Sequence, residues 1–194
     1  QTVEELVALA RIPSISAAGH DRAPVRRSAE RTARLLEDAG LEHVELLEVA
    51  DAHPYVTGDW LHAGDDAPTV LLYAHHDVQP VGTPARWTSD PFEPTERGGR
   101  LYGRGTADDK GQLMTFVEAA RAFISETGDL PVDVTVLFEG EEESGSPSLH
   151  PFLEANREEL SCDLALVCDT GMWDPETPAI SVMLRGMVGD EVIV

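Results

Sequence analysis

Short apolar runs that alternate with amphipathic segments are the feature that most limits what this chain can fold into. Four runs rich in β-forming residues are too short for helices, and they cover residues 43–49, 69–74, 132–138 and 164–168. Four segments carry apolar residues at helical spacing, and they cover residues 2–12, 24–39, 111–127 and 148–158. Strands that are apolar at nearly every position are typical of a sheet covered on both faces. The sequence therefore predicts an α/β fold with a mostly parallel central sheet flanked by helices.

One long connection interrupts this alternation. Residues 81–105 contain Pro84, Pro91 and Pro94 and show neither a helical nor a strand period. A connection of this length inside a compact domain has a function or contains a short hairpin. We therefore expect an irregular segment with one of these two explanations.

The charge balance and the distribution of apolar residues exclude several classes of protein. The chain has 36 Asp and Glu residues against 14 Lys and Arg, a net charge of -22, and its arginines are scattered apart from the Arg26-Arg27 pair. This composition argues against a nucleic-acid partner, since phosphate would be repelled. The chain has no apolar stretch near the roughly 20 residues of a membrane span, so no membrane partner is expected.

The N-terminal residues and the small number of cysteines indicate the cellular compartment. The first residues lack the basic and then apolar layout of a secretion signal, and the chain has only Cys162 and Cys168, too few for a disulfide framework. Both observations favour the cytoplasm.

Polar residues follow three of the predicted strands immediately. His75-His76-Asp77, Glu139-Gly140-Glu141-Glu142-Glu143 and Asp169 stand directly after the runs that end near residues 74, 138 and 168. Because ligands bind beyond the carboxyl ends of strands in an open α/β sheet, we expect these side chains to meet at one edge. Asp108-Asp109-Lys110-Gly111 opens a predicted helix and can reach the same edge.

Crowded carboxylates need a positive charge between them. Burying unpaired charges is very costly, and Lys110 is the single lysine of the chain. A metal site is therefore the economical explanation. Imidazole together with carboxylates suits zinc or manganese better than calcium, which prefers oxygen ligands alone.

Three motifs carry a resemblance to a known family. They are the segments Leu71-Leu72-Tyr73-Ala74-His75-His76-Asp77-Val78-Gln79-Pro80, Leu101-Tyr102-Gly103-Arg104-Gly105-Thr106-Ala107-Asp108-Asp109-Lys110-Gly111 and Phe138-Glu139-Gly140-Glu141-Glu142-Glu143-Ser144-Gly145-Ser146. In this order and spacing they resemble the co-catalytic di-zinc exopeptidases. That family includes carnosine-type dipeptidases, aminoacylase, glutamate-releasing carboxypeptidase and succinyl-diaminopimelate desuccinylase. The match is closest to the dipeptidase branch.

The resemblance implies a role for each matching position. It implies that the metal ligands are His75, Asp108, Glu143 and Asp169, with Asp108 bridging both ions. It makes Asp77 the carboxylate that orients His75, and Glu142 the general base. The implied cofactors are two divalent ions, Zn²⁺ first, with Mn²⁺ or Co²⁺ as alternatives.

Charge arithmetic agrees with this ligand set. Two divalent ions carry four positive charges, while three carboxylates and one hydroxide carry four negative ones. Glu142 then remains free to take a proton from a water held between ions roughly 3.5 to 4 Å apart, whose pKa the ions lower. The predicted function is hydrolysis of the peptide bond of dipeptides or short peptides by a metal-bridging hydroxide. The alternatives are an N-acyl amino acid deacylase of the same family, or a non-catalytic metal-binding or interaction homologue.

Two parts of the family pattern are missing from this sequence. The last metal ligand of the family is a histidine near the C-terminus of the full enzyme, and no histidine follows Asp169 here. The family also has a lid domain that mediates homodimers. We therefore expect residues 1–183 to be the N-terminal part of the catalytic domain and residues 184–194 to begin the lid or its connecting strand. We expect this chain alone to hydrolyse little.

Several residues near the motifs also have plainer interpretations. Asp109 is interpreted as a cap of the following helix, and His76 as a structural residue whose side chain points away from that of His75. Asp169 has the alternative role of capping a turn. The roles of Glu139 and Glu141 stay open.

Overall fold

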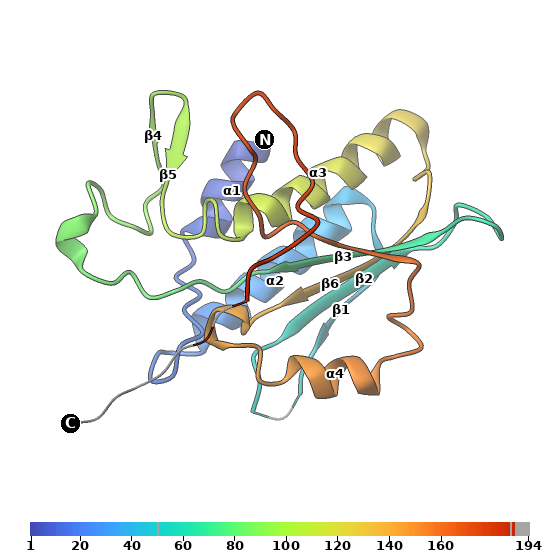
Figure 1. The fold of residues 1–194 in the computed structure, drawn as a ribbon, viewed down its shortest axis with the longest axis horizontal. Coiled ribbons are helices and arrows are strands. Elements are labelled where there is room, and N and C mark those ends of the chain that lie inside the picture. The colour runs from blue at the N-terminus through green and yellow to red at the C-terminus, as the bar shows by residue number, and fades with distance from the viewer. Residues whose placement is uncertain (50, 187, 189–194) are drawn as a thin grey trace.

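A five-stranded sheet forms the centre of the molecule (Figure 1), in a computed structural model that describes residues 1–49, 51–186 and 188. The strands lie in the order β1-β2-β6-β3-β7. Their bounds are β1 Glu42–Leu47, β2 Tyr55–Trp60, β3 Thr69–His75, β6 Asp133–Glu139 and β7 Leu164–Val167. Strand β3 pairs in parallel with β6 and β7, whereas β2 runs antiparallel to β1 and β6. All of these strands except β2 therefore point the same way, and the mostly parallel sheet is confirmed.

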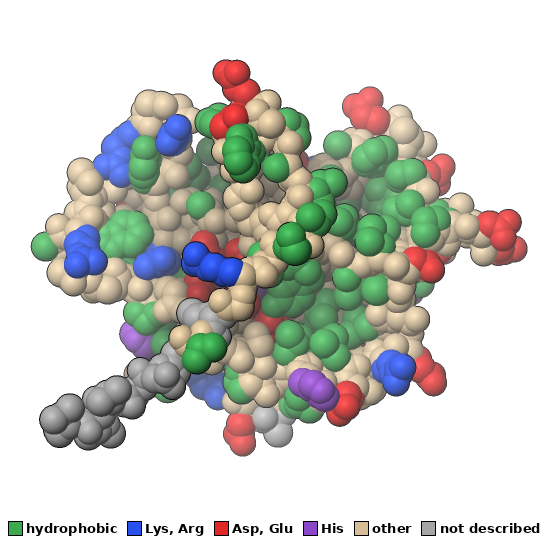
Figure 2. Space-filling view, viewed as in Figure 1, with side chains coloured by type: hydrophobic (Ala, Val, Ile, Leu, Met, Phe, Trp, Pro, Cys, Tyr) green, Lys and Arg blue, Asp and Glu red, His purple; other side chains and the backbone are tan. Residues whose placement is uncertain are grey.

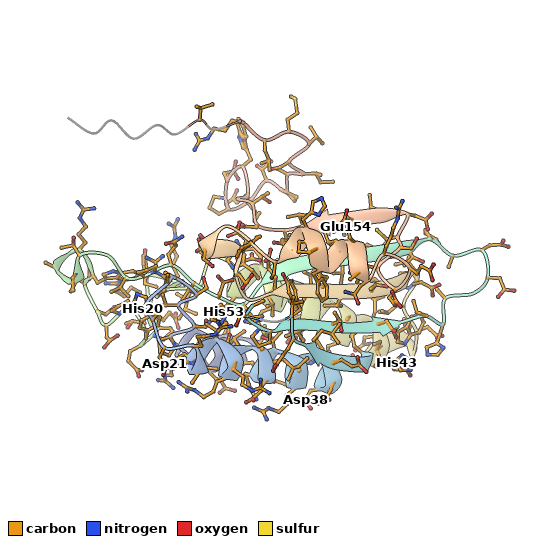
Figure 3. All side chains as sticks on the ribbon, turned by 90° about the horizontal axis from the view of Figure 1, so that it is seen from below. His20, Asp21, Asp38, His43, His53 and Glu154 are labelled. Atoms are coloured by element: carbon orange, nitrogen blue, oxygen red, sulfur yellow. The ribbon has the colours of Figure 1, made fainter. Side chains whose placement is uncertain are left out.

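Helices cover both faces of this sheet. The bounds are α1 Thr2–Ala10, α2 Ala23–Ala39, α3 Lys110–Thr127 and α4 Leu149–Ala155. Figure 3 shows Asp38 of α2 and Glu154 of α4 on opposite sides of the strands. All four helices were expected, although α4 ends three residues earlier than the apolar spacing indicated.

Local sequence explains where α2 begins and ends. Pro24 occupies the first turn, where the missing amide hydrogen costs nothing. Gly40 ends the helix in the left-handed conformation with a φ of 95°. Between them Val25, Ala29 and Leu36 form a buried stripe against the sheet.

Strand β2 was not expected from the sequence, and two further strands lie inside the long connection. Strand β2 contains Gly58 and Asp59, which interrupt its apolar pattern. A Cβ at Gly58 would lie 3.2 Å from Cγ2 of Val44 in β1, so the glycine allows the two strands to approach closely. Strands β4 (Thr95–Arg97) and β5 (Arg100–Tyr102) form an antiparallel hairpin inside the long connection. Gly98 and Gly99 supply its turn, both with positive φ. The long connection therefore contains a short hairpin, one of the two expected explanations.

Strand β6 lies at the centre of two hydrophobic cores. Val136 and Phe138 face the core under α1, α2 and α3, while Leu137 faces a smaller core that includes Phe152 of α4. Phe138 is fully buried and stacks against Phe116 of α3, with ring centroids 6.4 Å apart. This strand therefore holds both layers together.

The predicted start of a lid domain at residue 184 falls mostly on residues 187 and 189–194, which lie outside the described residues, so this division stays a prediction. Among the helices of the described residues, none is both long and apolar enough to cross a membrane.

Removing the Phe138 side chain should destabilise the fold strongly. Phe138→Ala leaves a cavity between β6 and α3, and we expect the free energy of unfolding to fall by about 3–5 kcal/mol in urea denaturation. Phe123→Ala is the matched control, since Phe123 of α3 is 48% exposed and its loss should cost far less. Equal losses in the two variants would contradict this account of the core.

Candidate metal centre

Side chains from four segments converge where β3, β6 and β7 end. His75 is the last residue of β3, and Asp169 follows β7. Glu142 and Glu143 lie in the short helix η2 (Glu142–Ser144) that follows β6. Asp108 lies just before α3. Because β3, β6 and β7 are parallel neighbours, their carboxyl ends meet at one edge and bring these side chains together.

The imidazole of His75 lies at the middle of the group. Its Nε2 atom is 3.2 Å from Oδ1 of Asp108, 3.7 Å from Oδ2 of Asp169 and 3.8 Å from Oε2 of Glu142. The described residues contain three sets whose possible ligand atoms all lie within 4.8 Å of one another. Two of them share His75, which joins Asp108 and Glu143 in one set and Glu142 and Asp169 in the other, while the third lies elsewhere, at Glu42, His43 and Asp59. Each set offers one imidazole and two carboxylates.

Asp77 lies behind the imidazole and joins it to the next loop. Its Oδ1 atom is 3.3 Å from Nδ1 of His75, and its Oδ2 accepts a hydrogen bond of 3.1 Å from the amide of Glu143. Both His75 and Asp77 are completely buried. Burial alone would raise the pKa of Asp77, but the adjacent His75 imidazole outweighs it and lowers that pKa.

Gln79 is a contributor that the sequence analysis left without a role. Its Nε2 donates to Oε2 of Glu143 at 2.9 Å and to the backbone oxygen of Glu143 at 2.8 Å. It holds the Glu143 carboxylate in place. The available signal was its position in the segment Asp77-Val78-Gln79-Pro80, where a polar amide stands two residues after Asp77.

The pKa shifts show how strongly this site favours positive charge. Burial alone would lower the pKa of His75, yet Asp77, Asp109 and Glu142 raise it to about 10. Burial raises the pKa of Glu142, and the carboxylates of Glu143 and Asp169 raise it further against the opposing effect of His75. Burial likewise raises the pKa of Asp169. The group therefore binds a cation or a proton more readily than isolated side chains do.

The donor atoms fit a divalent cation. Within the described residues, the buried atoms that lack a hydrogen-bond partner include Nε2 of His75 and Oε1 of Glu143. Buried polar atoms are normally satisfied, so these two indicate a ligand that the protein itself does not supply. Imidazole nitrogen with carboxylate oxygen is the donor set of zinc and manganese sites.

The interpretation of Asp109 as a helix cap is wrong. Asp109 stands at the N-cap position of α3 but makes no side-chain bond to the helix. Its Oδ2 instead accepts a hydrogen bond of 3.0 Å from the backbone amide of His75. Burial raises the pKa of Asp109 to about 7. The carboxylate points toward β3, and this hydrogen bond joins the start of α3 to the strand that carries His75.

Lys110 does not neutralise these carboxylates. It is completely buried, and its Nζ donates to the backbone oxygens of Leu9 at 3.1 Å and Ile12 at 2.9 Å. Burial lowers its pKa to about 7. The single lysine of the chain thus joins α3 to the end of α1, which leaves the charge of the carboxylates to another cation.

His76 anchors the segment between His75 and Asp77. Its ring nitrogen Nε2 lies 3.0 Å from the backbone oxygen of Pro54, and its own backbone oxygen accepts bonds from the hydroxyls of Ser14 and Ser28. Burial is the largest effect on its pKa and lowers it to about 4. These contacts agree with the structural role expected for His76.

Glu139 and Glu141, whose roles were open, support the surrounding loops. Glu139 accepts hydrogen bonds from the hydroxyls of Tyr73 and Ser146. Glu141 accepts a bond of 2.9 Å from the backbone amide of His53 with Oε1, and bonds from Ser148 with Oε2. Neither belongs to the three sets of possible ligand atoms.

The sequence matches one family and several of its members. A profile of peptidase family M20/M25/M40 matches residues 71–183, which is more than half of the chain. A cysteinylglycine-S-conjugate dipeptidase of Corynebacterium striatum is 40% identical over 152 residues, covering 78% of this chain and 33% of that protein. The chain therefore spans about a third of the length of this relative.

Two solved structures share the fold at appreciable identity. Human carnosine dipeptidase 1 superposes with a TM-score of 0.79 and 29% identity, over 89% of this chain and 38% of its own. The M20 family metallo-carboxypeptidase Sso-CP2 of Sulfolobus solfataricus superposes with a TM-score of 0.79 and 32% identity, over 90% of this chain and 38% of its own. The α/β architecture is therefore that of these catalytic domains.

The buried His76 should make the metal-free chain less stable at acidic pH. Its folded pKa of about 4 lies below the ordinary 6.5, so the unfolded chain binds more protons between these values. Stability from this group is complete above about pH 6.5 and is lost as pH falls toward 4, by roughly 2–3 kcal/mol at pH 4.5.

Urea denaturation at pH 7.5 and 4.5 measures this loss. The unchanged chain should lose more stability between these conditions than His76→Gln, which has no imidazole to protonate. His150→Gln, on the exposed surface of α4, is the control and should behave as the unchanged chain. The account fails if His76→Gln shows the same pH dependence as the unchanged chain.

Proposed function

The chain belongs to peptidase family M20/M25/M40, and on that premise we propose that it forms the N-terminal part of the catalytic domain of a metal-dependent dipeptidase. The proposed substrates are dipeptides or short peptides. The observation that carries the proposal is the group of carboxylates around the buried imidazole of His75, with the nearest oxygens of Asp108, Asp169 and Glu142 at 3.2–3.8 Å. The dipeptidase name of the Corynebacterium striatum relative supports the substrate class.

We propose that four residues hold two divalent cations, namely His75, Asp108, Glu143 and Asp169. The resemblance to the family implies that Asp108 would serve both ions; in the structure its Oδ1 lies 3.2 Å from Nε2 of His75, and it forms one ligand set with His75 and Glu143. Zn²⁺ is the proposed ion, and Mn²⁺ or Co²⁺ suit the same donors. When bound, such ions polarise the scissile carbonyl and lower the pKa of a water at the site.

The other residues of the site orient groups and move protons. Nδ1 of His75 lies 3.2 Å from the backbone oxygen of Asp77 and 3.3 Å from its Oδ1. A hydrogen on Nδ1 is therefore held by Asp77, which fixes the tautomer and leaves the Nε2 lone pair free for ligation. Glu142 takes a proton from the attacking water and delivers it to the leaving amine nitrogen. Its pKa, raised by burial, is closer to neutral pH, which suits a group that must both accept and donate a proton.

The deacylase alternative uses the same atoms on a different substrate. Hydrolysis of an N-acyl amino acid also breaks an amide bond, so His75 and Glu142 would act in the same way. The dipeptide is favoured because the bacterial relative, at 40% identity, is named for a dipeptidase activity. Parallel assays with cysteinylglycine, β-alanylhistidine and N-acetylated amino acids separate the two alternatives.

The finer features of the whole protein are proposals as well. We assign residues 1–183 to the catalytic domain and residues 184–194 to the start of the lid, through which the full-length protein would form a homodimer. The last metal ligand would be a histidine beyond Asp169. A cytoplasmic location is supported by the small number of cysteines, Cys162 and Cys168, neither of which forms a disulfide in the structure.

Metal content tests the proposed ligands. Elemental analysis after loading with zinc and dialysis should find bound metal in the unchanged chain and much less in His75→Ala and Asp169→Ala. Glu154→Ala removes an exposed carboxylate of α4 and is the control. Equal metal content in all four proteins would refute the assignment.

Activity of the full-length protein that contains this chain tests the role of Glu142. In that protein, Glu142→Gln should keep its bound metal and lower the kcat for cysteinylglycine by about 10²–10⁴-fold, because the proton acceptor is lost. Glu154→Gln should leave kcat unchanged. Unchanged turnover in Glu142→Gln would exclude Glu142 as the base, and a metal-loaded full-length protein without any hydrolysis would favour the non-catalytic alternative.

A further inference from the structure

A cavity lined by arginines lies between the short helix η1 (Pro84–Arg86) and the β4–β5 hairpin. Its volume is about 660 Å³. We call it the arginine cavity, and it is lined by Arg86, Trp87, Thr88, Arg97, Arg100, Leu101, Tyr102, Gly103, Thr106 and Ala107. Figure 2 shows Lys and Arg side chains gathered on this part of the molecule, where Figure 1 places the hairpin. The volume is within the ordinary range of small-molecule sites, roughly 300–1,000 Å³.

The charge of this cavity is opposite to that of the whole chain. Three arginines line it, and no aspartate or glutamate does. Four other cavities of the described chain each have at least one carboxylate in their lining. In a chain with a net charge of -22, a cavity without any carboxylate is a local reversal of charge.

The arginines of the cavity keep their charge free for a ligand. In the described part of the chain, the ion pairs between arginines and carboxylates involve Arg11, Arg26 and Arg121, none of which lines the cavity. The guanidinium of Arg97 instead lies 4.2 Å from the ring centroid of Tyr102. Stacking on an aromatic ring orients a guanidinium and leaves its N–H edge available to an anion.

We propose that the arginine cavity binds the carboxylate groups of a small organic acid. The planar fork of an arginine matches a carboxylate with two parallel hydrogen bonds, and two or more arginines can hold a dicarboxylate. Dicarboxylates are favoured over polyphosphates because polyphosphates carry more negative charges, which the net charge of -22 repels more strongly. The inference is separate from the proposed function, since none of the proposed metal ligands lines this cavity.

Calorimetric titration with succinate tests the inference. The chain is first freed of metal by chelation, because a metal-loaded centre also binds carboxylates, and ionic strength is held constant. Succinate should bind, and succinamide, its uncharged analogue, should not. In Arg86→Gln/Arg100→Gln the Kd for succinate should rise at least tenfold. Both arginines are exposed, so the fold should survive, which circular dichroism checks.

A matched variant distinguishes binding in the cavity from a general effect of the lost positive charge. Arg27→Gln/Arg34→Gln removes the same two charges from exposed positions of α2, outside the cavity, and should change the Kd for succinate by less than twofold. Equal weakening in the two double variants would overturn the proposal, as would binding of succinamide with the affinity of succinate. Absence of succinate binding to the unchanged chain would overturn it too, and would leave the metal-dependent function untouched.

Discussion

Repulsion among the carboxylates around His75 is the constraint on which the rest of this structure depends. Three parallel strands end at one edge and deliver acidic side chains to the same place. Lys110, the single lysine, is buried between α3 and the end of α1, so it does not relieve this repulsion. Burial lowers the pKa of His75, but Asp77, Asp109 and Glu142 outweigh it and raise that pKa to about 10, so the site favours a positive charge. A divalent cation would supply the positive charge that these carboxylates need.

A rigid frame behind the centre keeps these groups close despite their repulsion. His76 connects the end of β3 to α2, to the segment after α1 and to the loop before β2. Asp109 ties the start of α3 to His75 through a backbone amide. Asp77 joins His75 to the amide of Glu143. These buried polar contacts are fixed by the fold, so the donor atoms lie near one another before any ligand binds.

Charge is distributed unevenly over the chain, and the net charge alone does not reveal this. The centre at the strand ends concentrates negative charge, whereas the arginine cavity at the hairpin has no carboxylate in its lining. The two sites share no lining residue, although Ala107 of the cavity directly precedes Asp108 of the metal centre in the sequence. Opposite local charges allow one acidic domain to hold cations at one position and to receive an anionic group at another.

The sequence by itself determined the element types, the parallel sheet and the set of residues at the strand ends. Apolar runs and helical spacing reflect which side chains are buried locally, so they predict strands and helices. The motifs and the predicted strand ends identified His75, Asp108, Glu142 and Asp169 as residues that meet at one edge of the sheet. Tertiary structure decided the pairing of β2, whose Gly58 breaks the pattern but allows close approach to β1. It also turned Asp109 inward and placed Gln79 on Glu143. The direction of a polar side chain depends on partners far away in the sequence, and those become neighbours only when the chain folds.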